Sequence, residues 1–267
     1  MDKKLAVLEG LLRESAPLVV AYSGGVDSAC LLAVAQRTLG SEVLGVIADS
    51  PSLPRAALAE ALEVGRGFGA EVEVVRTEEM ENPDYASNSL NRCYFCKAEL
   101  FTKLDGLARE RGFRAIAYGE NADDVAATRP GSKAAAEFSV VAPLKAAGLT
   151  KAEVREVSRE LGLPTADAPA QPCLSSRVPH GTPVTPETLG FVERGEAAVR
   201  ALGFRIFRVR YLAGAEGDLP IARVQVGRDE MDRLDDAVRE RMELGLLAAG
   251  FGGVEVDPEG YGGAGVS

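Results

Sequence analysis

Short apolar runs alternate with amphipathic segments along the first 165 residues. Residues 18–22, Leu-Val-Val-Ala-Tyr, predict a buried strand, and a glycine-rich turn leads from them into an apolar helical segment at 29–35. The same order recurs further on, with strands predicted at 42–48, 71–75 and 114–118 and helices at about 54–66 and 96–111. This alternation predicts an α/β fold built on a doubly wound parallel sheet.

The pattern changes near residue 165. A helix is predicted at 151–161, with Thr150 as its cap and Glu153 at capping-box spacing. Six prolines between Pro164 and Pro186 then leave no room for a regular element, which indicates a junction. The rest predicts a smaller α+β domain, with a helix at 186–202, strands at 205–211 and 221–226, and a helix at 229–249. The glycine-rich tail from Tyr261 is predicted to fray.

The segment Ser23-Gly24-Gly25-Val26-Asp27-Ser28 joins the first strand to its helix. Backbone N–H groups and the positive end of the helix dipole converge at such a turn, and glycines let the chain curl around a phosphate. The alternative is a glycine-rich turn without a ligand. No lysine completes a Walker-type loop, so the segment favours release of pyrophosphate over chemistry at the γ-phosphate.

Polar residues also follow other strands of the predicted sheet. Ala48, Asp49 and Ser50 end the second strand, and Gly119 to Asp124 follow the strand at 114–118. Strand ends of a parallel sheet meet at one edge, so these residues are expected near a bound nucleotide. Within the later segment, the carboxylates are candidates to hold Mg²⁺. For Asp123 and Asp124 the alternative is stabilisation of a helix N-terminus.

Three of the four cysteines stand in a pattern that indicates metal chemistry. Cys93 and Cys96 form a C-x-x-C pair, and Cys173 lies in the proline-rich junction. Three thiolates can hold three irons of a [4Fe–4S] cluster and leave one iron open. A Cys3His zinc site that includes His180, the only histidine, is the alternative. Cys30 lies in an apolar helical segment, where a buried thiol is expected.

The acidic composition argues against nucleic-acid binding. The 267 residues carry a formal net charge of −10 with an isoelectric point near 4.9, the wrong sign for neutralising many phosphates. Arg205, Arg208 and Arg210 could still form a local basic group. No apolar run approaches the roughly 20 residues needed to span a membrane, and the N-terminus lacks the apolar core of a secretory signal. The expected location is therefore the cytoplasm.

The Ser23–Ser28 loop resembles that of the PP-loop ATP pyrophosphatases. Several further segments together make the chain similar to one family in that group, the LarE family of ATP-dependent sulfur transferases in nickel-pincer cofactor biosynthesis. These segments are residues 91–97, Arg129-Pro130-Gly131, residues 149–153, residues 171–177, residues 180–186 and residues 202–205. The resemblance implies a PP-loop domain at 1–165, a junction carrying Cys173 at 166–186, and a smaller substrate or oligomerisation domain at 187–267.

The resemblance also implies a reaction. ATP would adenylate a carboxylate of pyridinium-3,5-biscarboxylic acid mononucleotide with loss of pyrophosphate, and a sulfur nucleophile would displace AMP to give a thiocarboxylate. Family members with three cysteines use a [4Fe–4S] cluster, whereas others sacrifice the sulfur of the residue matching Cys173. Because this chain has Cys93, Cys96 and Cys173, the cluster version is expected, with sacrifice of Cys173 as the alternative.

The expected site follows from these assignments. The predicted cofactor-binding residues are Ser23, Gly24, Gly25, Asp27, Ser28, Ala48, Asp49, Gly119, Asn121 and Asp124. The predicted substrate-binding residues are Arg177, Glu196, Arg208 and Arg210, for which solvated surface charges are the alternative. The family also implies a homo-oligomer, a trimer or a hexamer.

Two other functions fit parts of the pattern. PP-loop enzymes that 2-thiolate tRNA also use three cysteines and a cluster, although the acidic composition and the lack of a recognisable added RNA-binding domain argue against that substrate. A nucleotide-binding or iron–sulfur protein without catalytic turnover is the second alternative. Release of pyrophosphate with a carboxylate substrate would distinguish an enzyme from such a binding protein.

Overall fold

The computed structural model describes residues 2–124, 130–215 and 217–262, and for 130–132 the backbone only. The chain forms two compact units, of which the first contains residues 1–82 and 91–168 and the second residues 83–90 and 169–267. Each unit has its own hydrophobic core. Within the described residues, no helix combines the length and the apolar character needed to cross a membrane.

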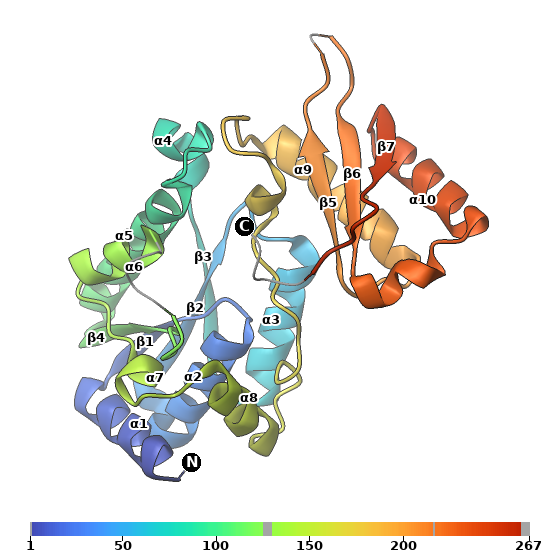
Figure 1. The fold of residues 1–267 in the computed structure, drawn as a ribbon. Helices are drawn as coiled ribbons and strands as arrows, with labels where there is room; N and C mark the ends of the chain where they lie inside the picture. The colour runs from blue at the N-terminus through green and yellow to red at the C-terminus, as the bar shows by residue number, and fades with distance from the viewer. Residues whose placement is uncertain (1, 125–129, 216, 263–267) are drawn as a thin grey trace. The chain divides into compact units, whose positions relative to one another are not determined.

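A four-stranded parallel sheet forms the centre of the first unit, which confirms the predicted parallel α/β fold (Figure 1). Its strands are β1 (Leu18–Ala21), β2 (Val43–Asp49), β3 (Val72–Arg76) and β4 (Ala115–Tyr118), in the order β3–β2–β1–β4. β2 and β3 therefore lie on one side of β1 and β4 on the other. The strand order reverses between β1 and β4, the place where open α/β sheets bind ligands.

Helices cover both faces of this sheet, because successive side chains of β1 point to opposite faces. Leu18 and Val20 belong to a core shared with α1, α2, α3 and α8, whereas Val19 packs with α5 and α6. The helices of the first unit are α1 (Asp2–Ser15), α2 (Val26–Leu39), α3 (Arg55–Gly67), α5 (Arg92–Arg111), α6 (Pro130–Glu137), α7 (Pro143–Ala146) and α8 (Lys151–Glu160), with short 3-10 turns at Gly40–Glu42 and Glu79–Glu81.

In the first unit, one helix starts earlier than predicted, and one segment of the family resemblance lies partly outside the described residues. The helix predicted from residue 96 begins at Arg92, so both residues of the C-x-x-C pair lie within its first five residues. The helix ends at Arg111, and its C-cap residue Gly112 adopts the left-handed conformation (φ 74°) and donates its N–H to the carbonyl of Ala108. Of the Arg129-Pro130-Gly131 segment, Arg129 lies outside the described residues, and Pro130 begins α6.

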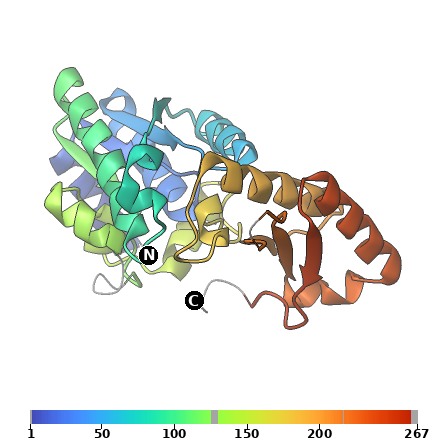
Figure 2. The same ribbon diagram turned by 90° about the horizontal axis from the view of Figure 1, so that it is seen from above.

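The second unit packs two helices on one face of a three-stranded sheet (Figure 2). β5 (Phe207–Leu212) pairs antiparallel with β6 (Ile221–Val226), and β6 pairs parallel with β7 (Gly253–Val256). The other elements are α4 (Pro83–Ala86), a 3-10 turn η4 (Leu174–Arg177), α9 (Pro186–Ala201), a 3-10 segment η5 (Arg228–Arg233) and α10 (Asp236–Ala248). The core contains Val199, Val209, Val224, Met242 and Leu246.

Three expectations for the second unit need correction. The helix predicted from 229 starts at Asp236, because the Asp235 carboxylate caps it by accepting the N–H of Val238 at 2.8 Å. The strand β7 was not predicted. The prediction that the tail frays from Tyr261 is wrong for that residue, since its N–H donates to the carbonyl of Val226 at 2.7 Å; residues 263–267 lie outside the described part.

Candidate functional site

The glycine-rich loop leaves the end of β1 at the reversal of strand order. Gly24 has φ +75°, a conformation that L side chains rarely adopt, and a Cβ added there would lie 2.6 Å from the Cβ of Ala61 on α3. Glycine is therefore required at this position for both conformation and space. The loop can pass this close to Ala61 of α3 only because residue 24 is glycine.

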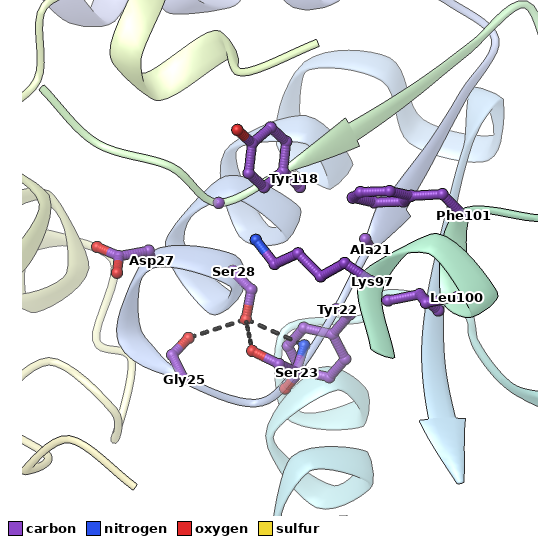
Figure 3. Close-up of a pocket in the computed structure, with 11 residues that line it drawn as sticks. Ala21, Tyr22, Ser23, Gly25, Asp27, Ser28, Lys97, Leu100, Phe101 and Tyr118 are labelled. Carbon is purple, nitrogen blue, oxygen red and sulfur yellow. Dashed lines mark hydrogen bonds between the residues drawn. The ribbon is translucent and has the colours of Figure 1, made fainter. Parts of the chain in front are cut away.

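The hydroxyl of Ser28 holds the loop in a tight curl (Figure 3). It donates to the carbonyl of Gly25 at 3.0 Å and accepts the N–H of Ser23 at 3.1 Å, and the hydroxyl oxygen of Ser23 lies 3.0 Å away. Ser28 itself is buried. The Ser28 hydroxyl, which is predicted to bind phosphate, therefore also holds the shape of the loop.

The loop leads into the N-terminus of α2, a helix of 14 residues. Its N-cap residue is Gly25, which has no side chain to satisfy the first N–H groups of the helix. These N–H groups and the helix dipole create positive potential at the start of α2. The start of α2 is therefore suited to an anionic ligand such as a phosphate chain.

Gly119 brings the end of β4 against this loop. A Cβ at residue 119 would lie 2.7 Å from the backbone nitrogen of Ser28 and 2.9 Å from the carbonyl carbon of Asp27. Backbone atoms cannot give way as a flexible side chain can. The two strand ends, β1 and β4, therefore approach as closely as they do only because residue 119 is glycine.

A cavity opens between these two strand ends. Five predicted nucleotide-binding residues line it, namely Ser23, Gly25, Asp27, Ser28 and Gly119, together with residues of β1, β4 and α5. The predicted residues Ala48 and Asp49 do not line this cavity. They lie at the end of the neighbouring strand β2, where the Asp49 carboxylate pairs with Arg55 and the buried Ser50 hydroxyl bonds to that of Ser52.

Among the residues that line the cavity, Asp27 is the one with a carboxylate. This carboxylate contacts two side chains from other parts of the first unit. Its Oδ2 atom lies 2.7 Å from the ammonium of Lys151, and its Oδ1 atom accepts the Nδ2–H of Asn121 at 3.3 Å. Asp124 joins indirectly, since its Oδ2 atom accepts the N–H of Asn121 at 3.1 Å. Asn121 and Asp124, both predicted as cofactor-binding residues, thus connect to the loop through Asp27.

Asp123 stabilises a helix N-terminus, which is the alternative to a role in nucleotide binding. Its Oδ2 atom accepts the N–H of Lys151, the first residue of α8, at 2.7 Å, so it supports a helix N-terminus. The same helix start has the predicted capping box between Thr150 and Glu153. These two caps fix the position from which the Lys151 side chain reaches Asp27.

Lys97, which was not predicted as a site residue, extends from α5 into the cavity (Figure 3). Its ammonium lies 4.8 Å from the centroid of the Tyr118 ring, within the range of a cation–π contact. The hydroxyl of Tyr118 donates a very short hydrogen bond to Glu120, whose other oxygen lies 3.4 Å from the ammonium of Lys145. The cavity therefore combines helix N–H groups with a positive charge, an arrangement that suits an anion.

The C-x-x-C pair lies on the same helix as Lys97. Near the start of α5, Cys93 is exposed and Cys96 is half-buried, and none of the four cysteines forms a disulfide. Within the described part of the first unit, no third histidine, cysteine or carboxylate joins them in a metal-binding group. Cys30 is fully buried, and burial raises its pKa to about 11, as expected for an unreactive structural thiol.

Cys173 lies in the second unit as the N-cap residue of η4, in a segment without other regular structure. Residues 83–90 anchor this segment. The Nδ2 group of Asn88, fully buried, donates to the carbonyls of Val178, Pro179 and Thr182 at 3.2, 2.7 and 2.9 Å. The hydroxyls of Tyr85 and Ser175, both buried, lie 2.8 Å apart. The reactive-cysteine candidate is thus held in place by side chains far away in sequence.

Arg177 and Glu196 form a buried ion pair beside Cys173. The Nε and Nη2 atoms of Arg177 donate to the two carboxylate oxygens of Glu196 at 2.7 and 3.1 Å, and both residues are at most 5% exposed. The Nη1 atom of Arg177 donates to the carbonyls of Pro172 and Cys173. The alternative of solvated surface charges is therefore wrong for this pair.

Arg208 and Arg210 lie on β5 beside the same segment. Arg208 is buried, its guanidinium donates to the carbonyls of Phe207 and Ala170, and it stacks 4.7 Å from the ring centroid of Tyr261. Burial and the nearby charge of Arg177 lower its pKa. Arg210 donates to the side chain of Gln225 at 2.6 Å and to the carbonyl of Ser176 at 3.2 Å.

Comparison with known proteins shows relatives along nearly the whole chain. No protein-family model matches. The chain is 38% identical over 262 residues to an uncharacterized protein of Synechocystis sp., which covers 98% of this chain and 96% of the relative. It is 30% identical over 260 residues to the pyridinium-3,5-bisthiocarboxylic acid mononucleotide synthase of Lactiplantibacillus plantarum, covering 97% of this chain and 91% of the synthase. An uncharacterized protein of Methanocaldococcus jannaschii is 26% identical over 211 residues, which cover 78% of this chain and 80% of that protein.

Proposed function

The chain belongs to the LarE family, and we propose that it inserts sulfur into a carboxylate of a pyridinium mononucleotide, with ATP as the activating substrate. The observation that carries the proposal is the similarity to the Lactiplantibacillus plantarum synthase, whose name gives the thiocarboxylate product and which matches 97% of this chain. The cavity at the start of α2 supports the use of ATP, because its N–H groups and Lys97 suit a phosphate chain.

The first step is adenylation of the carboxylate. A carboxylate oxygen attacks the α-phosphorus of ATP, the bond from that phosphorus to the bridging oxygen breaks, and pyrophosphate leaves. The product is an acyl adenylate, which is a better electrophile than a carboxylate. The N–H groups at the start of α2 bind the phosphates, and the Lys97 ammonium stabilises the charge that develops on them.

Magnesium fits the oxygen donors of the same cavity. Asp27 contributes a carboxylate at the loop, and Asp124 is held beside it through Asn121. Hard oxygen ligands of this kind, together with phosphate oxygens, are what Mg²⁺ prefers. When bound, the ion would neutralise phosphate charge, and Lys151 would be the residue that balances Asp27 in its absence.

The second step needs a sulfur nucleophile at the acyl carbon, with AMP as the leaving group. Cys93, Cys96 and Cys173, none of which forms a disulfide, would hold a [4Fe–4S] cluster, and the cluster would supply the sulfur. The alternative source is the Cys173 thiol itself. Its sulfur would attack the acyl carbon, and β-elimination, with loss of the Cα proton, would then break its Cβ–S bond and leave dehydroalanine.

Anaerobic turnover tests the proposal. The protein, purified with iron and sulfide, is incubated with ATP, sulfide and the pyridinium dicarboxylate mononucleotide, and AMP, pyrophosphate and the thiocarboxylate are measured. We expect more than one product per protein in the wild type, at most one in Cys93→Ser, and wild-type turnover in the matched control Cys30→Ser. Unchanged turnover in Cys93→Ser would contradict the cluster. A mass loss of about 34 Da at Cys173 after one turnover would identify sacrifice instead.

A further inference from the structure

The carboxyl ends of β2 and β3 carry buried oxygen-bearing side chains that the proposed function does not use. The pairing of the two strands extends past β3, because the N–H of Thr77 donates to the carbonyl of Asp49 at 3.2 Å. Ser50 and Thr77 therefore leave the sheet side by side. We call the side chains of these two residues, with those of Ser52 and Glu79, the oxygen cluster, and each of its four residues is at most 8% exposed.

The hydroxyls of the oxygen cluster direct their protons toward Glu79. Ser52 donates to Glu79 Oε1 at 3.3 Å. The hydroxyl oxygen of Ser50 lies 2.7 Å from that of Ser52, and Ser50 is the donor in this contact because Ser52 has a single proton to give. Ser50 in turn accepts the N–H of Ser52 at 3.1 Å. Glu79 Oε1 therefore acts as an acceptor, as an oxygen of an ionised carboxylate does.

Two oxygens of the cluster have no partner. Glu79 Oε2 and Thr77 Oγ1 are buried, and neither has a hydrogen-bond partner among the residues that the structure describes. In the same part of the chain, Thr165 Oγ1 is the one other buried side-chain atom in this condition. A buried carboxylate with a single hydrogen bond is costly, because burial removes its charge from water. The oxygen cluster therefore needs a further partner.

The missing positive charge does not come from a side chain of the described residues. None of their ion pairs includes Glu79, and the cations of neighbouring segments pair with other carboxylates. Arg55 pairs with Asp49, and Lys103 pairs with Glu78. A charge that balances Glu79 must therefore be supplied from outside the chain.

Size and charge restrict the ligand that the oxygen cluster can hold. Because the cluster is buried, a small ligand such as an ion or a water molecule is the kind that it can enclose. Carboxylate and hydroxyl oxygens are hard ligands that suit alkali and alkaline-earth cations. One carboxylate balances one positive charge, whereas a divalent ion would leave a buried net charge. A water molecule would satisfy hydrogen bonds but would not balance the charge.

We propose that the oxygen cluster holds a monovalent cation, Na⁺ or K⁺, between the ends of β2 and β3. Glu79 supplies the opposite charge, and the three hydroxyls replace part of the hydration shell of the ion. The bound ion links the turn at residues 50–53 to the 3-10 turn that begins at Glu79, and so stabilises both turns. The site is independent of the proposed function, because ion binding requires neither ATP nor the pyridinium substrate.

Urea unfolding of the full chain without nucleotide tests the site. NaCl, KCl and tetramethylammonium chloride are compared at equal concentration in a buffer free of alkali ions, since the tetramethylammonium ion is too large for the cluster. At about 100 mM salt, we expect NaCl or KCl to raise the ratio of folded to unfolded wild type about tenfold over tetramethylammonium chloride, as for an ion that binds only the folded state with a dissociation constant of about 10 mM. The salt with the larger effect identifies the ion.

Three variants locate the effect. Glu79→Gln keeps the size of the side chain without its charge, so its stability should be equal in the three salts. Thr77→Val removes one hydroxyl at nearly constant volume and should reduce the effect of the alkali salt. Glu81→Gln is the matched control, because Glu81 lies exposed in the same 3-10 turn and should leave the full effect in place.

Equal stability of the wild type in the three salts would contradict the site, and it is the result that a trapped water or a protonated Glu79 would give. An alkali effect of wild-type size in Glu79→Gln would also contradict it, because the ion would then bind elsewhere on the protein. If Glu79→Gln does not fold, Thr77→Val decides, and an undiminished effect in that variant has the same meaning.

Discussion

The ammonium of Lys151 lies 2.7 Å from the Oδ2 atom of Asp27, although 124 residues separate them in the chain. The contact joins the first residue of α8 to the first turn of α2, at the point where phosphates are expected to bind. Without the lysine, Asp27 would present an unbalanced negative charge to an incoming nucleotide. Lys151 therefore offsets the negative charge of Asp27 in the loop, although the lysine itself is part of α8.

We expect Lys151→Met to weaken binding of ATP about tenfold, the effect of about 1.4 kcal/mol of lost attraction. Lys151→Arg should retain most of the affinity, because the positive charge remains. Lys103→Met is the matched control, since Lys103 pairs with Glu78 and Glu99 on exposed surface of the same unit. Calorimetric titration with ATP measures all four proteins, and equal affinity for wild type and Lys151→Met would refute this role.

Gly119 offers a steric test of the same loop. In Gly119→Ala the new Cβ would lie 2.7 Å from the nitrogen of Ser28, so the loop must shift. We expect ATP affinity to fall at least about tenfold and the free energy of unfolding to fall by about 1–3 kcal/mol, as for an overpacked core. Calorimetry and urea unfolding measure the two effects.

The control for this substitution is Gly106→Ala. Gly106 lies inside α5, where an added Cβ meets no atom within 4 Å, and alanine should stabilise the helix by about 0.5–1 kcal/mol. ATP affinity should not change in this variant. A Gly119→Ala protein that binds ATP as tightly as Gly106→Ala would show that the loop tolerates the displacement.

The sequence predicted those parts of the site that depend on local chain geometry. The Ser23–Ser28 loop and Gly119 could be placed because a strand end followed by glycines is a local pattern. Lys97 was missed for a physical reason. A lysine on an amphipathic helix is usually solvated, and only the packing of α5 on β4 brings its ammonium over Tyr118.

Contacts between residues far apart in the sequence also explain why the site of the second unit could be predicted only in part. Arg177 and Glu196 stand 19 residues apart, and Asn88 binds carbonyls more than 90 residues away. No periodicity marks such pairs, so the sequence could not show that Glu196 is buried or that residues 83–90 join the second unit. Arg177 and Glu196, for which solvated surface charges were the alternative, are buried and paired with each other.

Glu196→Ala should reveal this structural role. Removing one partner of a buried ion pair leaves the other charge without compensation, at a cost of about 3–5 kcal/mol in the free energy of unfolding. The N–H of Val209, which donates to Glu196 at 3.3 Å, would lose its acceptor as well. Urea unfolding compares this variant with Glu243→Ala on the exposed surface of α10, which should cost less than about 0.5 kcal/mol. Equal stability of the two variants would contradict the structural role.

The capping box of α8 makes a prediction about pH. Glu153 accepts hydrogen bonds from the Lys4 ammonium at 2.7 and 2.8 Å and from the N–H of Thr150 at 2.8 Å. These contacts, that of Lys4 foremost, lower the pKa of the Glu153 carboxyl from 4.5 to about 2. The folded state therefore binds the proton of this group less readily than the unfolded state does.

Stability from Glu153 is fully present above pH 4.5 and is lost as the pH falls from 4.5 toward 2, because the unfolded state takes up the proton first. Glu153→Gln cannot ionise and lacks this contribution. We expect the urea midpoint of wild type to exceed that of Glu153→Gln by a constant amount near neutral pH, and the difference to shrink steadily below pH 4.5. Glu156→Gln, on the exposed side of the same helix, should show no such convergence. The contrary result would be a difference in urea midpoint between wild type and Glu153→Gln that stays constant down to pH 3. It would mean that the Glu153 carboxylate does not stabilise the start of α8, although it lies beside Lys4.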